Sequence, residues 1–342
     1  MVTSIKEETF SPCIAYTGTR PVEYAAVPLT MYSTGADHLE SYTSMSALLE
    51  HFYAEKNTLT RIRQKSSDLR RIVQTALERD IKKYDLQLAQ MKDTEKREKY
   101  RIYGELLNTY GYSAKPGDKS LTAVNYYTSE PVTIPLDPTL SATENAKKYF
   151  DKYGKLKRTY EALSELTTQV KEEIDHLETI STALDIALKE EDLVEIKEEL
   201  TQSGYIRRKG GTKKAKITSK PFHYLSSDGF HIYVGKNNFQ NDELTFKFAT
   251  GNDWWFHAKG IPGSHVVVKT EGKELPDRTF EEAGRLAAYY SKGREQEKVE
   301  IDYVQKKQVK KPAGAKPGFV VYYTNYSLMI DSDISGIEKI SD

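Results

Sequence analysis

The chain has 342 residues, of which 38% are apolar and 29% are charged, and its 50 Lys and Arg residues balance 50 Asp and Glu residues. This charged fraction is too high for one compact core and too patterned for a disordered chain, and it is typical of long charged helices. A single cysteine, Cys13, excludes an intrachain disulfide, and no apolar run approaches the length of a membrane span.

The first segment, residues 1–45, predicts short strands and loops. Its apolar stretches are brief, and Pro12, Pro21 and Pro28 interrupt any helical period. Such a segment is too small to bury a core alone. It is interpreted as the remnant of an N-terminal lobe. No basic-then-apolar signal sequence is recognisable at its start, which favours a cytoplasmic protein.

Residues 46–203 predict an antiparallel coiled-coil arm. From Ser46 to Tyr110 apolar residues recur at steps of three and four, and no proline interrupts them. The segment therefore predicts one helix of about 60 residues, which would be ~90 Å long.

A short β insert is expected at about 121–136, after Gly111 and Pro116 end the first helix. The second helix starts at a capping box, Ser141 to Glu144. Its apolar stripe runs from Tyr149 to Leu188, and is interpreted as the core of the helix pair rather than as a cofactor site.

Residues 221–342 predict a C-terminal α+β domain, because the hydrophobic period changes to two. One helix is expected behind a capping box at Thr279 to Glu282. Strands are predicted at 222–225, 231–234, 244–248, 254–257, 265–269, 299–303, 319–323 and 327–330. The whole chain is thus predicted to be α+β, with a long antiparallel helical coiled coil and a small β insert.

Two basic segments mark the C-terminal half, where residues 205–342 carry 23 Lys and Arg against 17 Asp and Glu. Each segment is either a solvated linker or loop, or a strip that contacts phosphates. The linker 204–220 supplies Arg207, Arg208, Lys213 and Lys214, and the loop 305–318 supplies Lys306, Lys307, Lys310, Lys311 and Lys316.

The segment 234–245 is dense in polar side chains that follow a glycine. Such residues either bond to their own turn or contact base edges and sugars. The candidates for nucleic-acid binding here are Lys236, Asn237, Asn238, Asn241 and Asp242.

The segment 252–269 combines aromatic residues with histidines. Consecutive aromatic residues on a strand point to alternate faces, so one pair is expected in the core and the other as a stacking surface that includes Trp255 and His257. Ser264 and His265 follow Gly263 in a loop that suits phosphate.

His257 and His265 are interpreted as structural residues. A metal site is the weaker hypothesis because too few further ligands lie nearby. A Ser264–His265 nucleophile pair is weaker still because no third group orients the histidine. No Walker loop, HExxH or CxxC is present. We therefore expect a binding module without a cofactor, rather than an enzyme.

These clusters resemble the NFACT family over roughly residues 10–330. In the C-terminal domain the resemblance rests on 228–230, 234–238, 241–245, 255–257, 263–265, 282–283 and 309–318. In the helical region it rests on 104–107, 136–138, Asn145-Ala146, Tyr149-Phe150 and Lys155.

The resemblance implies a fragment of a ribosome quality-control factor that binds tRNA and the large ribosomal subunit through an NFACT-R domain. Full-length members of one type add alanine residues to stalled chains without a template. The resemblance implies that this tailing needs the family's N-terminal lobe. Other members are described as fibronectin- or fibrinogen-binding adhesins of bacterial virulence. That alternative requires display at the cell surface by a non-classical route.

Overall fold

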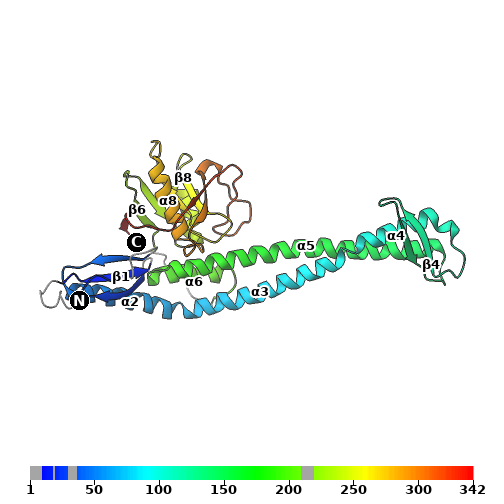
Figure 1. Ribbon diagram of the computed structural model, residues 1–342, viewed down its shortest axis with the longest axis horizontal. Coiled ribbons are helices and arrows are strands. Elements are labelled where there is room, and N and C mark those ends of the chain that lie inside the picture. Colours follow the sequence, from blue (N-terminus) through cyan, green and yellow to red (C-terminus); the bar gives the residue numbers. More distant parts are fainter. Residues whose placement is uncertain (1–9, 18–19, 30–36, 209–218, 342) are drawn as a thin grey trace. The chain divides into compact units, whose positions relative to one another are not determined.

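The protein is described by a computed structural model that covers residues 10–17, 20–29, 37–208 and 219–341 (Figure 1). It divides into two compact units, one of residues 1–76 and 175–342 and the other of residues 77–174. Antiparallel sheets and long helices make the chain α+β, as the sequence predicts. No helix in the described ranges has the length and apolar character to cross a membrane.

The N-terminal segment forms a small sheet of order β2-β1-β3, built from β1 (Cys13–Thr17), β2 (Arg20–Ala25) and β3 (Asp37–Ser41). Helix α2 (Met45–Lys65) begins at Ser44, whose hydroxyl accepts a hydrogen bond from the backbone N–H of Ala47. The sheet buries its core against this helix rather than alone, through Ile14, Tyr16, Leu48 and Phe52.

The predicted single helix of residues 46–110 is three helices, so that expectation was wrong in detail. Helix α2 ends before Ser66, α3 spans Ser67–Thr94, and α4 spans Arg97–Tyr110. At both breaks a hydroxyl donates to a backbone carbonyl three residues earlier, from Ser66 to Arg63 and from Thr94 to Met91. Such local bonds compete with regular helix geometry, and the apolar period does not reveal them.

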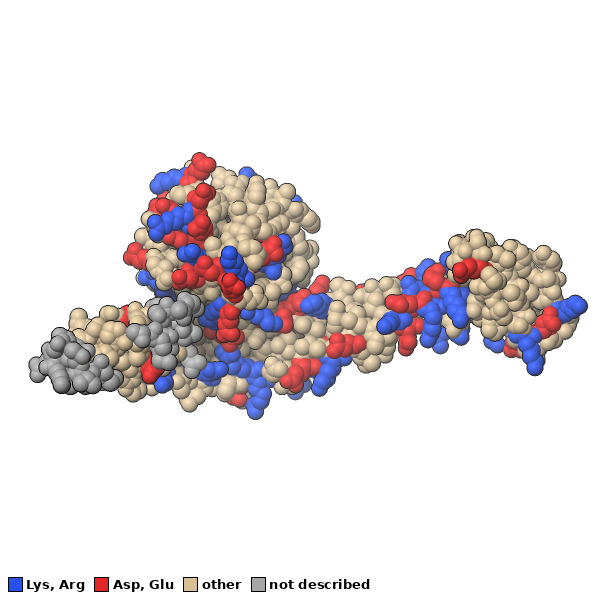
Figure 2. All heavy atoms as spheres, in the orientation of Figure 1, with Lys and Arg blue, Asp and Glu red and all other residues tan. Residues whose placement is uncertain are grey.

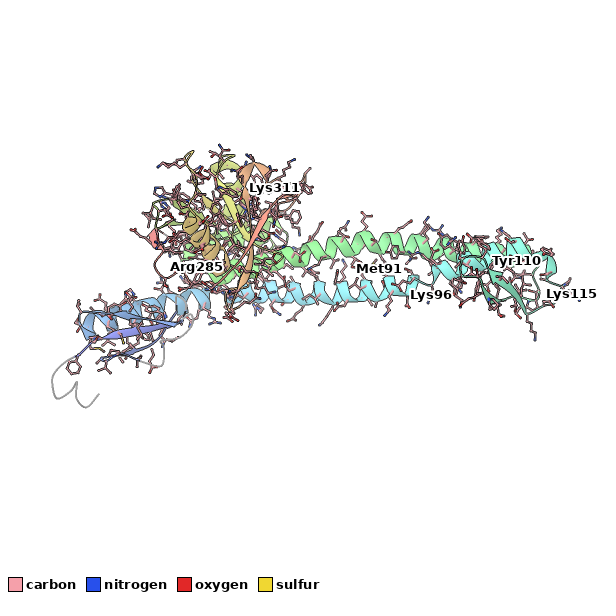
Figure 3. All side chains as sticks on the ribbon, turned by 45° about the horizontal axis from the view of Figure 1, so that its top comes forward. Met91, Lys96, Tyr110, Lys115, Arg285 and Lys311 are labelled. Atoms are coloured by element: carbon pink, nitrogen blue, oxygen red, sulfur yellow. The ribbon has the colours of Figure 1, made fainter. Side chains whose placement is uncertain are left out.

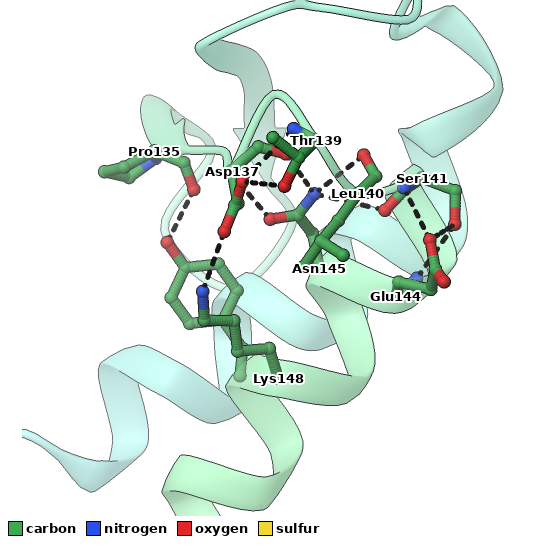
Figure 4. Close-up of polar contacts among 9 residues, drawn as sticks. Pro135, Asp137, Thr139, Leu140, Ser141, Glu144, Asn145 and Lys148 are labelled. Carbon is green, nitrogen blue, oxygen red and sulfur yellow. Dashed lines mark hydrogen bonds and ion pairs between the residues drawn. The ribbon is translucent and has the colours of Figure 1, made fainter.

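The β insert and the second helix start are confirmed. Strands β4 (Ser120–Asn125) and β5 (Glu130–Pro135) form an antiparallel hairpin, and helix α5 spans Ala142–Ile186. The Ser141 hydroxyl accepts from the Glu144 backbone N–H at 3.2 Å, and the Glu144 carboxylate accepts from the Ser141 N–H at 2.8 Å (Figure 4).

The loop before α5 is fixed by Asn145. Its side-chain nitrogen donates to the backbone oxygens of Asp137, Leu140 and Ser141, while its oxygen accepts from the Asp137 N–H (Figure 4). The Asp137 carboxylate also pairs with Lys148, and hydrogen bonds from Thr139 together with that ammonium lower its pKa to about 2. This network orients the hairpin on the helix pair.

Helices α3 and α4 run antiparallel to α5 in the second unit. Thr167 lies within 3.5 Å of the Met91 sulfur, the Arg97 guanidinium lies 4.0 Å from the Tyr160 ring centroid, and Tyr103 packs edge-on against Tyr149. Met91 is labelled between the two helices in Figure 3. Figure 2 shows basic and acidic side chains interspersed along this part of the chain. The stripe is therefore the core of a helix pair.

Gly104 allows the closest approach of α4 and α5. A Cβ there would lie 2.8 Å from the ring of Phe150, whereas a Cβ at Gly154 would find its nearest neighbour, the Arg158 side chain, at 3.8 Å. Overpacking of this kind costs ~1–3 kcal/mol. Gly104→Ala is expected to lower the free energy of unfolding by that amount in urea titrations followed by far-UV circular dichroism.

Gly154→Ala is the matched control, since it gains helix propensity of up to ~1 kcal/mol without a clash. If the Gly104→Ala variant were as stable as the parent chain, α4 and α5 would be able to move apart at this point and make room for the added Cβ.

The C-terminal domain is built on a seven-stranded antiparallel sheet of order β11-β10-β8-β9-β7-β6-β12. Helix α8 (Asp277–Tyr289) packs on one face. The strands are β6 (Phe222–Leu225), β7 (His231–Val234), β8 (Trp254–Ala258), β9 (Val266–Val268), β10 (Val299–Gln305), β11 (Tyr326–Ile330) and β12 (Glu338–Ser341).

Two predicted strands of this domain were wrong. Residues 244–248 form a π-helical turn, η3 (Leu244–Phe248), directly after the short helix α7 (Asn238–Glu243). Residues 319–323 contribute a single bridge, between Val321 and Lys310. Both segments cover the sheet face opposite α8, where Leu244 is buried and Phe246, Val320 and Tyr322 are half-buried without strand pairing. Burial on one side produces the same alternation in a covering loop as in a strand.

The predicted capping box of α8 was also wrong, because the helix begins at Asp277. The Thr279 hydroxyl donates to the Asp228 carboxylate at 2.7 Å, and Glu282 accepts from the backbone N–H of Ser227 at 2.8 Å. These residues tie α8 to the turn between β6 and β7 instead of capping their own helix.

Candidate nucleic-acid interface

The segment 235–242 leaves β7 through Gly235, where a side chain could be accommodated only if Asn241 moved. A Cβ at Gly235 would lie 2.2 Å from the Asn241 side-chain oxygen and 3.0 Å from the Asn241 backbone nitrogen. Asn237 then caps α7, because its side-chain oxygen accepts from the Gln240 N–H at 3.0 Å. The local geometry is thus a self-bonded turn, which was one of the two readings of this motif.

Helix α6 (Glu190–Gln202) supplies a carboxylate to each of the three side chains at the start of this turn. The Lys236 ammonium lies 3.2 Å from Asp192, and the Asn237 amide donates to Glu195 at 2.7 Å. The Asn238 amide donates both to Glu199 and to the Thr179 hydroxyl of α5, each at 2.7 Å. We call these three carboxylates, Asp192, Glu195 and Glu199, with Lys236, Asn237 and Asn238, the carboxylate latch.

Every side chain of the latch is at least 96% buried. Asp192 also accepts from the backbone N–H groups of Leu188 and Lys189, each at 3.0 Å, and so it starts α6 as well as holding Lys236. A buried ion pair is tolerated only when further hydrogen bonds satisfy its remaining atoms, and Asp192 meets that condition.

Burial raises the pKa of the Glu199 carboxyl to about 8, with the neighbouring charges of Glu195 and Asp242 acting in the same direction. Burial also raises the pKa of Glu195. One Glu199 oxygen has no hydrogen-bond partner among the described residues, while the other lies 3.7 Å from His176. A protonated Glu199 fits this site better than a charged one.

The carboxylate latch limits the contacts that Lys236, Asn237 and Asn238 can make with a nucleic acid. Lys236, Asn237 and Asn238 are already bonded to carboxylates of their own chain and are shielded from solvent. Contact with a phosphate or a base would require the latch to open. Their direct role in nucleic-acid binding stays a prediction.

The next residues bind the turn to neighbouring loops. The Asn241 side-chain oxygen accepts from the His265 backbone N–H at 3.0 Å, and the His265 ring bonds to the Thr245 hydroxyl at 2.7 Å. Asp242 accepts from the Gly318 N–H at 3.0 Å and pairs with Lys311, which is labelled in Figure 3. These contacts join the predicted loops 234–245, 263–265 and 305–318 into one assembly.

Trp255 offers no stacking face in this structure, which corrects its interpretation as surface. Its side chain is 0% exposed, with its ring centroid 5.6, 5.0 and 5.2 Å from those of His257, His265 and Tyr322. Burial lowers the pKa of His257 to about 4 and holds that of His265 well below its usual value, so both rings are neutral. Ser264 is buried beside them. In the described ranges no three potential ligands gather around a metal position.

The basic loop begins with a short turn, η4 (Lys306–Gln308), on which Lys306 is half-buried and Lys307 is exposed. The backbone N–H groups of Lys306 and Lys307 donate to Asp253 and Gly251 at 2.8 and 3.1 Å. Lys307 and Lys310 are exposed, and no described carboxylate forms an ion pair with them or with Lys306. Lys316 is half-buried.

The basic linker is placed only in part. Arg208 pairs with Glu198 of α6, and Arg207 is exposed. Lys213 and Lys214 lie outside the described residues. The linker's described end therefore contributes one free-standing guanidinium, and the loop 305–318 contributes the larger group of exposed cations.

The latch carboxylates were missed by sequence reasoning, although a signal exists. Asp192, Glu195 and Glu199 recur at three- and four-residue steps, in the same period as Ile196 and Leu200. Acidic residues within an apolar stripe face the core and need buried donors. The predicted apolar stripe ended at Leu188, so these carboxylates were given no role.

The chain is similar to known families over nearly all its length. Residues 1–219 match the model of the NFACT N-terminal and middle domains, and residues 220–323 match that of the NFACT protein RNA binding domain.

Curated relatives share the same similarity. The Rqc2 homolog RqcH of Streptococcus suis is 41% identical over 90% of this chain and 55% of its own. The RqcH of Bacillus subtilis is 36% identical over 98% of this chain and 59% of its own. The chain thus spans little more than half the length of these relatives.

A solved structure is also similar, namely the C-terminal part of the fibronectin/fibrinogen-binding protein from Streptococcus suis. It is 37% identical, with a TM-score of 0.65, and the match covers 81% of this chain and 99% of the solved one. Taken with the family models, these similarities show that the chain belongs to the NFACT family.

Proposed function

We propose that this chain is an RNA-binding part of a ribosome quality-control factor, and that it contacts the large ribosomal subunit and tRNA. The observation that carries the proposal is the η4 turn with the residues just after it, where Lys306, Lys307 and Lys310 have no carboxylate partner among the described residues. Unpaired lysines on a rigid turn are suited to neutralise phosphates. The match to the NFACT RNA binding domain and the similarity to RqcH proteins support it.

The proposed role is binding rather than catalysis, in the cytoplasm where ribosomes lie. Of the two histidines that could serve as catalytic groups, His265 is buried and His257 is half-buried, and burial lowers the pKa of both so that they are neutral. Template-free tailing, if the full-length relatives perform it, would use parts of the protein beyond the RNA-contacting loops described above.

Charge reversal tests the proposal. Lys307→Glu and Lys310→Glu are each expected to weaken binding to tRNA at least several-fold, and to reduce the slope of log K against log salt by about 0.7–0.9 per lost phosphate contact. Lys298→Glu is the matched control, because Lys298 is also exposed but precedes β10, whereas Lys307 follows it. Fluorescence anisotropy at several salt concentrations measures both quantities.

Equal weakening by the control would indicate a nonspecific charge effect. Unchanged affinity in all variants, or affinity that does not depend on salt, would contradict the proposed RNA interface.

A second candidate function is fibronectin or fibrinogen binding, which the name of the similar Streptococcus suis protein favours. It predicts that fibronectin binds the chain and that the Lys307 and Lys310 variants leave this binding intact, since protein adhesion need not use the phosphate-binding lysines. Antibody labelling of intact cells decides whether the protein is displayed: label that appears only after lysis contradicts an adhesin.

A further inference from the structure

The π-helical turn η3 carries two phenylalanines at the edge of the core that it covers, and Phe246 packs partly against that core. Leu244 and Thr245 are buried, whereas Phe246 is half-buried and Phe248 is 41% exposed. The backbone N–H of Ala249 donates to the Leu244 carbonyl at 2.8 Å, five residues earlier, which closes the turn. Such π turns are rare and are frequent at functional sites.

Lysines surround these rings. The Lys306 ammonium lies 5.7 Å from the centroid of Phe246, and the Lys269 ammonium lies 5.0 Å from that of Phe248. Lys307 lies next to Gly251: a Cβ added at Gly251 would be 3.7 Å from the Lys307 Cβ. We call Phe246, Phe248, Lys306 and Lys307, with Lys247 between the two rings in sequence, the aromatic–lysine ridge.

The acidic neighbours do not cancel the charge of this ridge. Asp253 is 1% exposed and is taken by Lys269 and by the backbone N–H groups of Thr250 and Thr270. Glu243 lies 3.8 Å from Lys247 at an exposed position. Lys306 and Lys307 remain without a carboxylate partner in the described part of the chain.

We propose that the aromatic–lysine ridge binds a single-stranded segment of RNA, with unpaired bases stacked on Phe246 and Phe248 and the adjoining phosphates at Lys306 and Lys307. Bases in an A-form duplex are stacked on one another, so their faces are closed to side chains. An exposed ring beside cations suits an unpaired base next to its own phosphate. This inference rests on the proposed function and adds to it a ring contact and a preference for unpaired strands.

Replacing each ring by a smaller apolar side chain separates base stacking from the burial of apolar surface. Phe246→Leu keeps an apolar side chain against the buried cluster, and Phe248→Leu keeps one against the Tyr233 ring, but neither variant has an aromatic face at the substituted position. Each is expected to weaken binding of a 12-nucleotide oligoadenylate about tenfold, as loss of one stacked base predicts. The affinity for a duplex RNA of equal length is expected to change less than twofold.

A fluorescent base provides a readout that packing alone would not move. A 2-aminopurine placed in the oligoadenylate is expected to be quenched on binding to the parent chain and to stay bright with Phe248→Leu at saturating protein. Met329→Ala, which removes an exposed apolar side chain from β11, is the control and should leave quenching unchanged.

The outcomes separate the two proposals. If Lys307→Glu weakens RNA binding while both leucine variants bind and quench like the parent chain, the stacking proposal is overturned and the proposed function stands. If Lys307→Glu and the leucine variants all bind like the parent chain, both fail.

Discussion

Lys236→Met is expected to lower the free energy of unfolding of the C-terminal domain by about 3–5 kcal/mol, because it leaves the Asp192 carboxylate buried without its counterion. The two groups lie 3.2 Å apart with side chains 2% and 1% exposed. The ammonium also lies 4.4 Å from the Phe222 ring centroid, so methionine keeps the apolar contact and removes the charge. The change therefore isolates the electrostatic contribution of the ion pair.

Tryptophan fluorescence in urea measures this change. The only two tryptophans, Trp254 and Trp255, lie on β8 in the C-terminal domain, so the signal reports that domain rather than the helix pair. Lys298→Met, at an exposed position, is the control and is expected to change stability by no more than ~0.5 kcal/mol.

A second substitution distinguishes lost pairing from lost packing. Adding Asp192→Asn to Lys236→Met removes the stranded charge, while the amide oxygen can still accept from the backbone N–H groups of Leu188 and Lys189. The double variant is expected to be more stable than Lys236→Met alone. If it is less stable, the ion pair is not the source of the effect.

The helix pair and most strands follow from hydrophobic period, and the capping box at Ser141 is a local signal that the structure confirms. The same signal at Thr279 failed, because Glu282 found a partner in Ser227, about fifty residues earlier. Local motifs identify which bonds a residue can make. They do not identify the partner when a distant segment competes for it.

The candidate site shows the same limit. The sequence identifies Lys236, Asn237 and Asn238 as candidates for nucleic-acid binding. Their side chains are hydrogen-bond donors, however, and a donor suits a buried carboxylate as well as a phosphate. Only the fold places α6 over these donors. Phe246 and Phe248 were missed because alternation in residues 244–248 predicted a strand of the sheet, whereas the segment forms a π turn on which Phe246 is half-buried and Phe248 is exposed.

Glu199→Gln is expected to remove part of the pH dependence of stability. The folded pKa of Glu199 is about 8, above its ordinary value of 4.5, so the folded state binds more protons than the unfolded chain between these values. The stabilising contribution of the protonated carboxyl is therefore complete below about pH 4.5 and is lost as pH rises through 8. The shift corresponds to as much as about 5 kcal/mol.

The glutamine variant is uncharged at every pH and keeps an oxygen that accepts from Asn238. Relative to the parent chain, it should therefore gain stability between pH 5 and pH 9, by several kcal/mol at most, in urea titrations followed by tryptophan fluorescence. Comparison at each pH cancels the contributions of other titrating groups. Glu191→Gln, an exposed change on the same helix, should show no such gain. A stability difference that stays constant across this range would mean that Glu199 is charged in the latch, and that its burial is compensated by His176 at 3.7 Å.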